Sequence, residues 1–369
     1  MKVNRLNYIG SKFQLLDWLD TTIKEKTAWN SFQGKRIGDL FAGTGIVSHH
    51  FRSKGAITLT NDAELYSSII SEAFGLGTYT PVCEAFIARV NADIVLKKHV
   101  APLVQVGYIQ ANYSPHGECK RMFFTVENAI RIDYIRAQIE SSQISLAINA
   151  AEHTFLLASL LLSADAVSNV PAVYGCFLKK FKPKAEKQLI LAPIHTNIVA
   201  PLTGSKAYYS DVLAMGDIQC DAVYLDPPYN ERQYSKNYFP LNMIAKTAAQ
   251  QAGTAVLKGV TGIPPDCFIS PFCKKTEVKA AFKKLVGGLK AEWVFISYSS
   301  ESLIPKDEMV ALLKVYGDIT VVEREYKRFK AYEYNEDKKI MEFLFCLKKV
   351  PAVPAVPAVP AVPAIPAVP

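Results

Sequence analysis

The sequence predicts an α/β fold built around a wound sheet, with a largely helical insertion in the middle of the chain. Short apolar segments are followed by glycine- or proline-containing turns, and segments of helical character alternate with them, as expected for one sheet. The pattern changes between residues 81 and 206, where helical segments and a basic run prevail. Because ligands of wound sheets bind beyond the carboxyl ends of the strands, the residues that follow each strand are the first candidates for a site.

The predicted strands are short apolar runs with abrupt ends. Residues 35–41 form the first strand, followed by a turn over residues 42–45 and a helix over residues 46–54. Residues 56–60 form the second strand, which ends at Asn61 and Asp62. Further strands are predicted over residues 220–225, 292–298 and 342–347.

The inserted region is expected to be mainly helical. Helices are predicted over residues 127–140 and 151–166, and a basic run covers residues 178–184. The apolar run Phe155 to Leu162 is interpreted as part of a buried helix, because a membrane span needs about 20 such residues. The chain is therefore divided into a discontinuous main domain, residues 1–80 and 207–349, and an inserted region, residues 81–206.

The last residues of the chain repeat the triplet Pro-Ala-Val and are set apart from the fold as residues 350–369. Proline at every third position removes backbone donors and blocks a helix. The three-residue period matches polyproline II, so an extended or disordered, solvated tail is expected, with the role of a spacer rather than of a docking site.

The composition indicates an intracellular protein. The net charge of +8 suits a polyanionic partner such as DNA, although many unrelated proteins are equally basic. The seven cysteines show no C-x-x-C spacing and are interpreted as reduced thiols, and the six histidines do not cluster, so no metal is predicted. The first residues lead into a polar stretch and not into an apolar signal region, so a cytoplasmic location without membrane attachment is expected.

Two segments after the first strands are candidates for binding a nucleoside-containing cofactor. Asp39, Phe41, Gly43 and Gly45 end the first strand and form its turn, where glycines let the backbone approach a ligand closely. This signal is weak alone, since an ordinary strand–turn–helix junction looks the same and the spacing of a dinucleotide site is missing. Asp62 lies about 20 residues further on, where an acidic side chain can accept both hydroxyls of a ribose; alone, it would equally suit a helix N-cap.

Asp226, Pro227, Pro228 and Tyr229 follow an apolar strand and give the strongest signal. Two consecutive prolines form a stiff loop that can only accept hydrogen bonds. The Asp226 carboxylate and the Pro227 carbonyl can accept the two N–H bonds of an adenine amino group, which would aim its lone pair at a sulfonium methyl. Tyr229 offers a face for stacking an extruded base. The alternative is a rigid surface turn.

Three weaker candidates complete the predicted cofactor and nucleic-acid contacts. Tyr8 and Lys12 belong to a glycine-containing turn that can hold the methionine end of a cofactor, with Lys12 near its carboxylate; the alternative is a helix cap with a solvated lysine. Asp211 can accept from a cofactor adenine or be a solvated turn residue. Aromatic and polar residues after the proline loop, and the basic run, suit base stacking and phosphate contact, or a plain solvated face. These are Arg232, Tyr234, Asn237, Tyr238, Lys179 and Lys180.

Taken together, these segments resemble the D12-class, or alpha-group, DNA adenine-N6 methyltransferases. The order matches: a lysine-containing segment at Asn7–Lys12, the F-x-G-x-G loop at Phe41–Gly45, the acidic Asp62, an inserted region and then Asp226–Tyr229. Segments at residues 123–129, 157–161, 173–180 and 232–238 resemble a restriction–modification branch of the family.

The resemblance implies a Rossmann-like, S-adenosylmethionine-dependent methyltransferase fold with a mixed, mostly parallel sheet and helices on both faces. It implies that Asp226 and Pro227 bind the target amino group and that Tyr229 stacks on a flipped adenine. It also implies that Phe41 and Gly43 contact the cofactor, Asp62 its ribose and Asp211 its adenine. The inserted region would read a short sequence in double-stranded DNA, and methylation would protect that DNA from a restriction endonuclease.

Alternatives to adenine-N6 methylation remain at this point. Cytosine-N4 methylation can use the same kind of loop, although such loops more often begin with serine. A catalytically silent DNA-binding protein is disfavoured by the intact Asp226–Tyr229 segment. Cytosine-C5 chemistry is disfavoured because no Pro-Cys dipeptide occurs in the chain. A monomer or weak dimer is expected.

Overall fold

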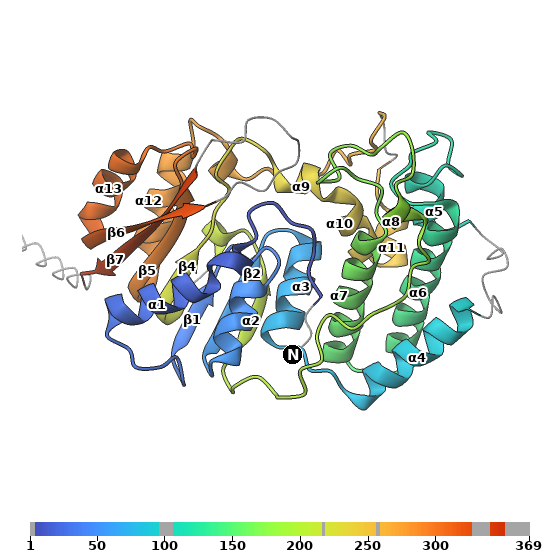
Figure 1. The fold of residues 1–369 in the computed structure, drawn as a ribbon, viewed down its shortest axis with the longest axis horizontal. Helices are drawn as coiled ribbons and strands as arrows, with labels where there is room; N and C mark the ends of the chain where they lie inside the picture. The colour runs from blue at the N-terminus through green and yellow to red at the C-terminus, as the bar shows by residue number, and fades with distance from the viewer. Residues whose placement is uncertain (1–3, 96–105, 216–217, 256–258, 327–339, 351–369) are drawn as a thin grey trace, which may run out of the picture.

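The computed structural model describes residues 4–95, 106–215, 218–255, 259–326 and 340–350, and the Pro-Ala-Val repeat from residue 351 lies outside the described residues. Within these ranges the chain forms one seven-stranded sheet in the order β3-β2-β1-β4-β5-β7-β6 (Figure 1). The strands are β1 (Arg36–Asp39), β2 (Ile57–Asp62), β3 (Lys206–Tyr209), β4 (Gln219–Leu225), β5 (Lys290–Ser299), β6 (Gly317–Tyr326) and β7 (Ile340–Lys349).

The sheet is mixed and mostly parallel, which confirms the predicted fold class. Five strands run parallel to one another, in the order β3, β2, β1, β4 and β5. β7 is antiparallel to both β5 and β6. β1 and β4 are parallel neighbours at the centre of the sheet, although the whole inserted region separates them in the sequence. The carboxyl ends of β1, β2 and β4 therefore lie next to one another.

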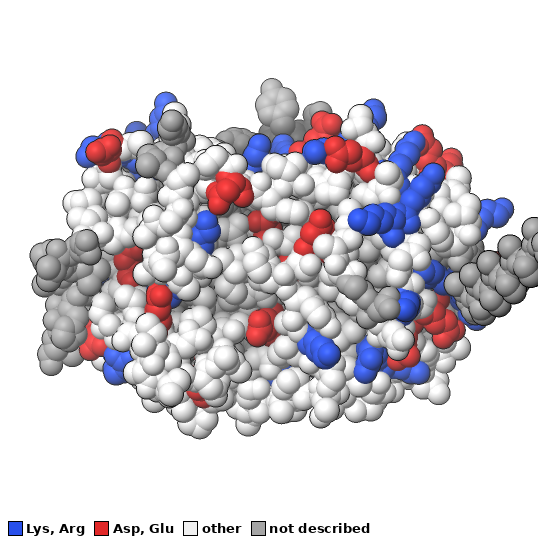
Figure 2. Space-filling view, turned by 180° about the vertical axis from the view of Figure 1, so that it is seen from behind, with Lys and Arg blue, Asp and Glu red and all other residues white. Residues whose placement is uncertain are grey.

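Helices cover both faces of the sheet. Alternate residues of β4 point to opposite faces: Val223 and Leu225 pack with α12 (Val278–Gly288) and α13 (Lys306–Leu313). Ala222 and Tyr224 pack instead with α1 (Leu16–Thr27) and α2 (Ile46–Ser53). Seen from behind, basic side chains gather over the end of the molecule that carries α12 (Figure 2), where Lys279, Lys283 and Lys284 are exposed.

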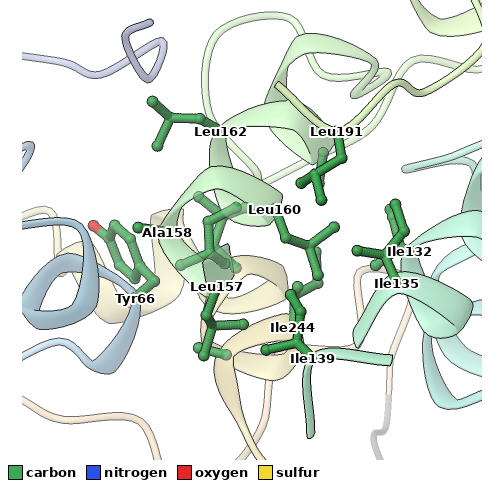
Figure 3. Packing of buried hydrophobic residues seen from close by; sticks show 14 of the residues in the cluster. Tyr66, Ile132, Ile135, Ile139, Leu157, Ala158, Leu160, Leu162, Leu191 and Ile244 are labelled. Atoms are coloured by element: carbon green, nitrogen blue, oxygen red, sulfur yellow. The ribbon is translucent and has the colours of Figure 1, made fainter. Parts of the chain in front are cut away.

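A second, mostly helical core lies beyond the β2–β3 side of the sheet (Figure 1). Its centre is α7 (Ala150–Ala166), which is buried along most of its length and packs against α3 (Leu65–Gly75) and α6 (Val126–Ile144). Side chains from these three helices and from α10 (Phe239–Ala245) meet there (Figure 3). The apolar run predicted as a buried helix lies in α7. Among the described residues, no helix is both long and apolar enough to cross a membrane. The helices are α3 (Leu65–Gly75), α4 (Pro81–Val95), α5 (Tyr108–Tyr113), α6 (Val126–Ile144), α7 (Ala150–Ala166), α8 (Pro183–Glu186), α9 (Tyr234–Asn237), α10 (Phe239–Ala245) and α11 (Ala248–Ala252).

This helical core is not confined to the inserted region. α10 follows the proline loop in sequence and contributes Phe239, Leu241 and Ile244, and α3 contributes Tyr66 and Ile70. The two parts of the chain thus share one apolar core, and the division at residues 80 and 206 stays a prediction. The described residues also form short 3₁₀ helices, which are η1 (Lys12–Leu15), η2 (Val212–Ala214), η3 (Pro271–Cys273) and η4 (Lys314–Tyr316).

Candidate active site

A pocket opens where β1, β2 and β4 end, and segments far apart in the sequence line it. Its empty space is about 1130 Å³, including solvent at the mouth, which is ample for a small-molecule ligand. Twelve of the predicted site residues line this pocket: Tyr8, Lys12, Asp39, Phe41, Gly43, Asp62, Asp211, Asp226, Pro227, Pro228, Tyr229 and Tyr234. The sheet topology thus brings together the candidates for cofactor binding and for chemistry.

The two glycines of the turn after β1 serve different purposes. Gly43 and Gly45 both adopt left-handed backbone conformations, with φ of +52° and +68°. A Cβ atom on Gly43 would lie 3.1 Å from the ring of Tyr8 at the pocket wall, whereas one on Gly45 would lie 2.6 Å from the Cα of Ser71 in α3. Gly45, predicted as a cofactor contact, does not line the pocket; it allows α3 to pack closely against the turn.

Asp62 fixes the glycine turn and also faces the pocket. Its Oδ2 accepts a hydrogen bond from the Gly43 N–H at 2.8 Å, and its Oδ1 accepts one from the Glu64 N–H at 2.9 Å. A carboxylate offers about four acceptor positions, so further positions remain for the hydroxyls of a ligand. Burial raises the pKa of Asp62, although these backbone hydrogen bonds favour the charged form.

Two buried acceptor atoms at the floor of the pocket have no hydrogen-bond partner within the described parts of the chain. One is Oδ1 of Asp39, whose Oδ2 accepts from the backbone and hydroxyl of Ser48 at 3.1 and 2.7 Å. The other is Oδ1 of Asn61, whose Nδ2 donates to the carbonyls of Leu40 and Ser210. Buried polar atoms are normally paired, so these two indicate a ligand that donates hydrogen bonds. Burial raises the pKa of Asp39 to about 7.

Lys12, Asp226, Tyr229 and Glu342 form a buried charged cluster beside the proline loop. Lys12 Nζ lies 2.9 Å from Asp226 Oδ1 and 3.7 Å from Glu342 Oε1. The hydroxyl of Tyr229 lies 2.9 Å from the same Asp226 oxygen and 2.6 Å from Glu342 Oε1. The Lys12 and Tyr229 contacts to Asp226 are thus both made at Oδ1. Lys12, predicted near a cofactor carboxylate, is thus placed primarily against Asp226.

Glu342 is a site residue that the sequence did not single out, and Asn61 was noted only as the neighbour of Asp62. Glu342 lies on β7, opposite Ser299 of β5 and Arg324 of β6, and only 3% of it is exposed. An acidic residue at the start of an apolar strand looks like a solvated strand end in the sequence. Only the antiparallel insertion of β7 beside β5 brings it next to the loop after β4.

The aromatic residues after the proline loop divide into pocket and core residues. Tyr234 lines the pocket, and its hydroxyl lies 3.5 Å from the Ile9 carbonyl. Tyr238, predicted as a DNA contact, is fully buried: its ring stacks on Tyr8 at 4.9 Å between centroids, and its hydroxyl accepts from the Ile9 N–H. That prediction is corrected, because a buried tyrosine supporting the pocket wall cannot reach a duplex.

The other predicted DNA contacts lie outside the pocket. Lys179, Lys180 and Arg232 are exposed, and Asn237 is half-buried at the end of α9, where its carbonyl accepts from the Tyr174 N–H. Their contact with DNA stays a prediction. Asp211, which lines the pocket, also caps η2 by accepting from the Leu213 N–H at 3.0 Å.

Sheet and pocket define an α/β protein with a ligand site at its strand ends, and comparison with known proteins identifies its family. Residues 8–312 match the model of the D12 class N6 adenine-specific DNA methyltransferases. The chain belongs to this family, and is by that membership an adenine-specific DNA methyltransferase.

Its relatives include methyltransferases of restriction–modification type. The type II methyltransferase M.CviAII of Paramecium bursaria Chlorella virus 1 is 40% identical over 345 residues, which cover 93% of this chain and 98% of that protein. The type II methyltransferase M.NlaIII of Neisseria lactamica is 35% identical, with 88% of this chain and 93% of that protein covered. The modification methylase LlaI of Lactococcus lactis subsp. lactis is 31% identical, and the match covers 55% of its length.

A solved structure, a SAM-dependent methyltransferase from Agrobacterium tumefaciens, aligns with 92% of this chain and 61% of its own. With a TM-score of 0.27 and 10% identity, this likeness supports no conclusion.

Proposed function

We propose that this protein methylates N6 of an adenine that is flipped out of a short recognition sequence in duplex DNA, with S-adenosylmethionine bound in the pocket. The observation that carries the proposal is the convergence at one pocket of unpaired buried acceptors, the glycine turn and a fixed Asp226 carboxylate. When bound, S-adenosylmethionine supplies an electrophilic methyl group on a sulfonium.

The pocket floor suits the polar groups of this cofactor. Asp62 would accept from the ribose hydroxyls, since its remaining lone pairs are positioned beside the Gly43 backbone. The unpaired Oδ1 atoms of Asp39 and Asn61 would accept from the cationic amino group of the methionine moiety. Phe41 and Tyr8 would line the apolar part, and Asp211 would face the adenine.

Asp226 is held in one orientation for the target amino group. Lys12 and the Tyr229 hydroxyl both contact Oδ1, which leaves Oδ2 to accept an N–H bond of the adenine amino group. The carbonyl of Pro227 would accept the other N–H bond. Two acceptors pull the nitrogen toward a tetrahedral geometry and make its lone pair available, because delocalisation into the ring is reduced.

Tyr229 can stack on an extruded adenine from one side only. The Lys12 ammonium lies 4.8 Å from the centroid of the Tyr229 ring, so one face of the ring already carries a cation. Tyr298 contacts the ring edge to face, at 5.3 Å between centroids. A stacked base would therefore use the opposite face of Tyr229.

The partners follow from the family and from its named relatives. The inserted region, residues 81–206, would read the sequence, and Lys179, Lys180 and Arg232 would contact phosphates. Because relatives carry the names of type II methyltransferases, the methylation is proposed to protect DNA from a cognate endonuclease. A DNA substrate would place the enzyme in the cytoplasm, and no metal takes part in the proposed chemistry.

One experiment tests the base and the donor together. The protein is incubated with unmethylated DNA and methyl-labelled S-adenosylmethionine, the DNA is digested to nucleosides, and the labelled nucleoside is identified by mass spectrometry. Label in N6-methyladenine is expected. Label in N4-methylcytosine would keep the pocket assignments and overturn the base, and absence of label with intact cofactor binding would overturn the proposed reaction.

A further inference from the structure

Glu342 has no counterpart among the motifs that identify the family here, yet it completes the charged cluster at Asp226. Its Oε1 and Oδ1 of Asp226 both contact the same Tyr229 hydroxyl, at 2.6 and 2.9 Å. That hydroxyl carries one proton and can donate to only one carboxylate at a time. The arrangement therefore has two proton positions joined by one hydroxyl group.

The cluster holds one cation and two carboxyl groups. Lys12 is 2.9 Å from Asp226 but 3.7 Å from Glu342, so the ammonium stabilises the charge of Asp226 more than that of Glu342. Burial raises the pKa of both carboxyl groups. The other groups that face Glu342 are the Tyr224 phenol and, across the strands, Ser299 and the exposed Arg324. Of the two carboxylates, Glu342 is thus the better place for an additional proton.

The proposed reaction produces a proton next to this cluster. Methyl transfer forms the nitrogen–carbon bond and breaks the carbon–sulfur bond, whose electron pair stays on sulfur. The adenine nitrogen is left with a positive charge and one surplus proton. Its neighbour in the proposed site is Asp226.

We propose that Glu342 is a positioning residue that accepts this proton through Tyr229. As the nitrogen–carbon bond forms, one N–H proton passes to Oδ2 of Asp226. The neutral carboxyl group, no longer attracted to Lys12, turns about its Cβ–Cγ bond and gives this proton to the Tyr229 oxygen as the hydroxyl proton of Tyr229 moves to Glu342. The products are a neutral methylamino group, an ionised Asp226 and a protonated Glu342, which releases the proton to solvent after the DNA has left. This inference rests on the proposed function of the same site.

Two conservative substitutions interrupt the transfer at different atoms. Glu342→Gln keeps the size of the side chain and removes the acceptor, and Tyr229→Phe keeps the ring and removes the hydroxyl. General acid–base catalysis contributes roughly 100- to 10,000-fold to a rate. We expect each variant to slow methyl transfer by about 100-fold, measured by rapid quench under single-turnover conditions on a plasmid whose sites the wild-type enzyme has been shown to methylate.

The double variant distinguishes a shared path from two independent effects. If both residues act on one proton path, the double variant with Glu342→Gln and Tyr229→Phe should have a methyl-transfer rate within about threefold of that of the slower single variant. Multiplied effects of the two substitutions would overturn the proposal. Glu342→Asp keeps a carboxylate and is expected to recover at least about tenfold of the rate lost in Glu342→Gln.

The pH profile separates proton acceptance from mere support of the fold. The wild-type rate should rise with pH as Glu342 ionises, because only the carboxylate can accept. Glu342→Gln should lose this limb and keep only that of Asp226, which ionises at lower pH. Asp20→Asn is the matched control: Asp20 is a buried carboxylate paired with Lys24 at 2.7 Å, on α1 and outside the pocket. It should lower stability and leave the rate and its pH profile unchanged.

Cofactor affinity and thermal unfolding of each variant complete the test. A Glu342→Gln enzyme within threefold of the wild-type rate, with the same pH profile, would overturn the proposal. So would a slow variant whose loss is fully explained by weaker cofactor binding. If Glu342→Gln does not fold, the rates and pH profiles of Glu342→Asp and Tyr229→Phe are compared with those of the wild type instead. Failure of the wild type to form N6-methyladenine would refute the proposed function instead.

Discussion

Three glycines with the same backbone conformation and different surroundings allow the cost of a methyl group to be worked out in advance. Gly34, Gly43 and Gly45 have φ of +72°, +52° and +68°. An alanine in this left-handed region costs about 1–2 kcal/mol for the backbone alone. A Cβ on exposed Gly34 would meet no atom within 4 Å, so Gly34→Ala measures that backbone cost directly.

The other two substitutions add steric terms of different size. At Gly43 the new methyl would lie 3.1 Å from the Tyr8 ring, which must move by a few tenths of an ångström. At Gly45 it would lie 2.6 Å from backbone of α3 and 3.2 Å from Phe74, and overpacking of a well-filled site costs about 1–3 kcal/mol. The expected losses of unfolding free energy are about 1–2 kcal/mol for Gly34→Ala, slightly more for Gly43→Ala, and about 2–5 kcal/mol for Gly45→Ala.

Binding of S-adenosylmethionine should follow a different order from stability. Gly43→Ala alters the pocket wall and the N–H that Asp62 accepts, so a loss of roughly tenfold in affinity, about 1.4 kcal/mol, is expected. Gly34→Ala should bind as the wild type does. Urea unfolding and calorimetric titration measure the two quantities. The reasoning is refuted if Gly45→Ala is no less stable than Gly34→Ala, or if Gly43→Ala binds the cofactor normally.

Three further predictions concern single side chains. Asp226→Ala should abolish methyl transfer while cofactor binding largely survives, since Lys12 keeps Glu342 as a partner; near-normal turnover would remove Asp226 from the chemistry. Asp62→Ala should weaken cofactor binding by roughly 1–3 kcal/mol through lost charge-assisted hydrogen bonds, and an unchanged dissociation constant would contradict its ribose role. Burial lowers the pKa of His195 to about 4, below the unfolded value of about 6.5, so its contribution to stability is present above pH 6.5 and is lost as the pH falls toward 4. Between pH 6.5 and 5, the difference in unfolding free energy between wild type and His195→Gln should fall by up to about 1.4 kcal/mol per pH unit in urea titrations, and a difference that does not change with pH would contradict the reasoning.

Strands with apolar interiors and abrupt ends could be predicted, and edge strands could not. β1, β2, β4, β5 and β7 lie where apolar runs placed them, to within a few residues. β3 and β6 were missed because both lie at the edges of the sheet. β3 is a four-residue segment with no fully buried side chain, and β6 carries charged residues at Glu323, Arg324 and Glu325. A strand with one open side needs no continuous apolar run.

The sequence could predict site residues that directly follow a strand. It could not predict residues that reach the site only because two strands pair in the sheet. Asp39, Asp62 and Asp226 stand directly at strand ends, so the sheet itself places them together. Glu342 reaches the site because β7 pairs antiparallel with β5, and no local sequence pattern near residue 342 predicts this pairing. For Tyr238 the local pattern was misleading. Its polar and aromatic neighbours in the sequence suggested a DNA contact, but its ring stacks behind Tyr8 in the pocket wall.

The charged cluster combines residues that are far apart in the sequence, and this has a consequence for synthesis. Lys12 leaves the ribosome 330 residues before Glu342 (342 − 12), which arrives with β7. At about 5–20 residues per second, a nascent chain spends many seconds with its glycine turn made and its final strand still missing. A prematurely terminated product that ends before β7 would carry every recognisable motif and still lack the Glu342 carboxyl group beside Asp226 and Tyr229.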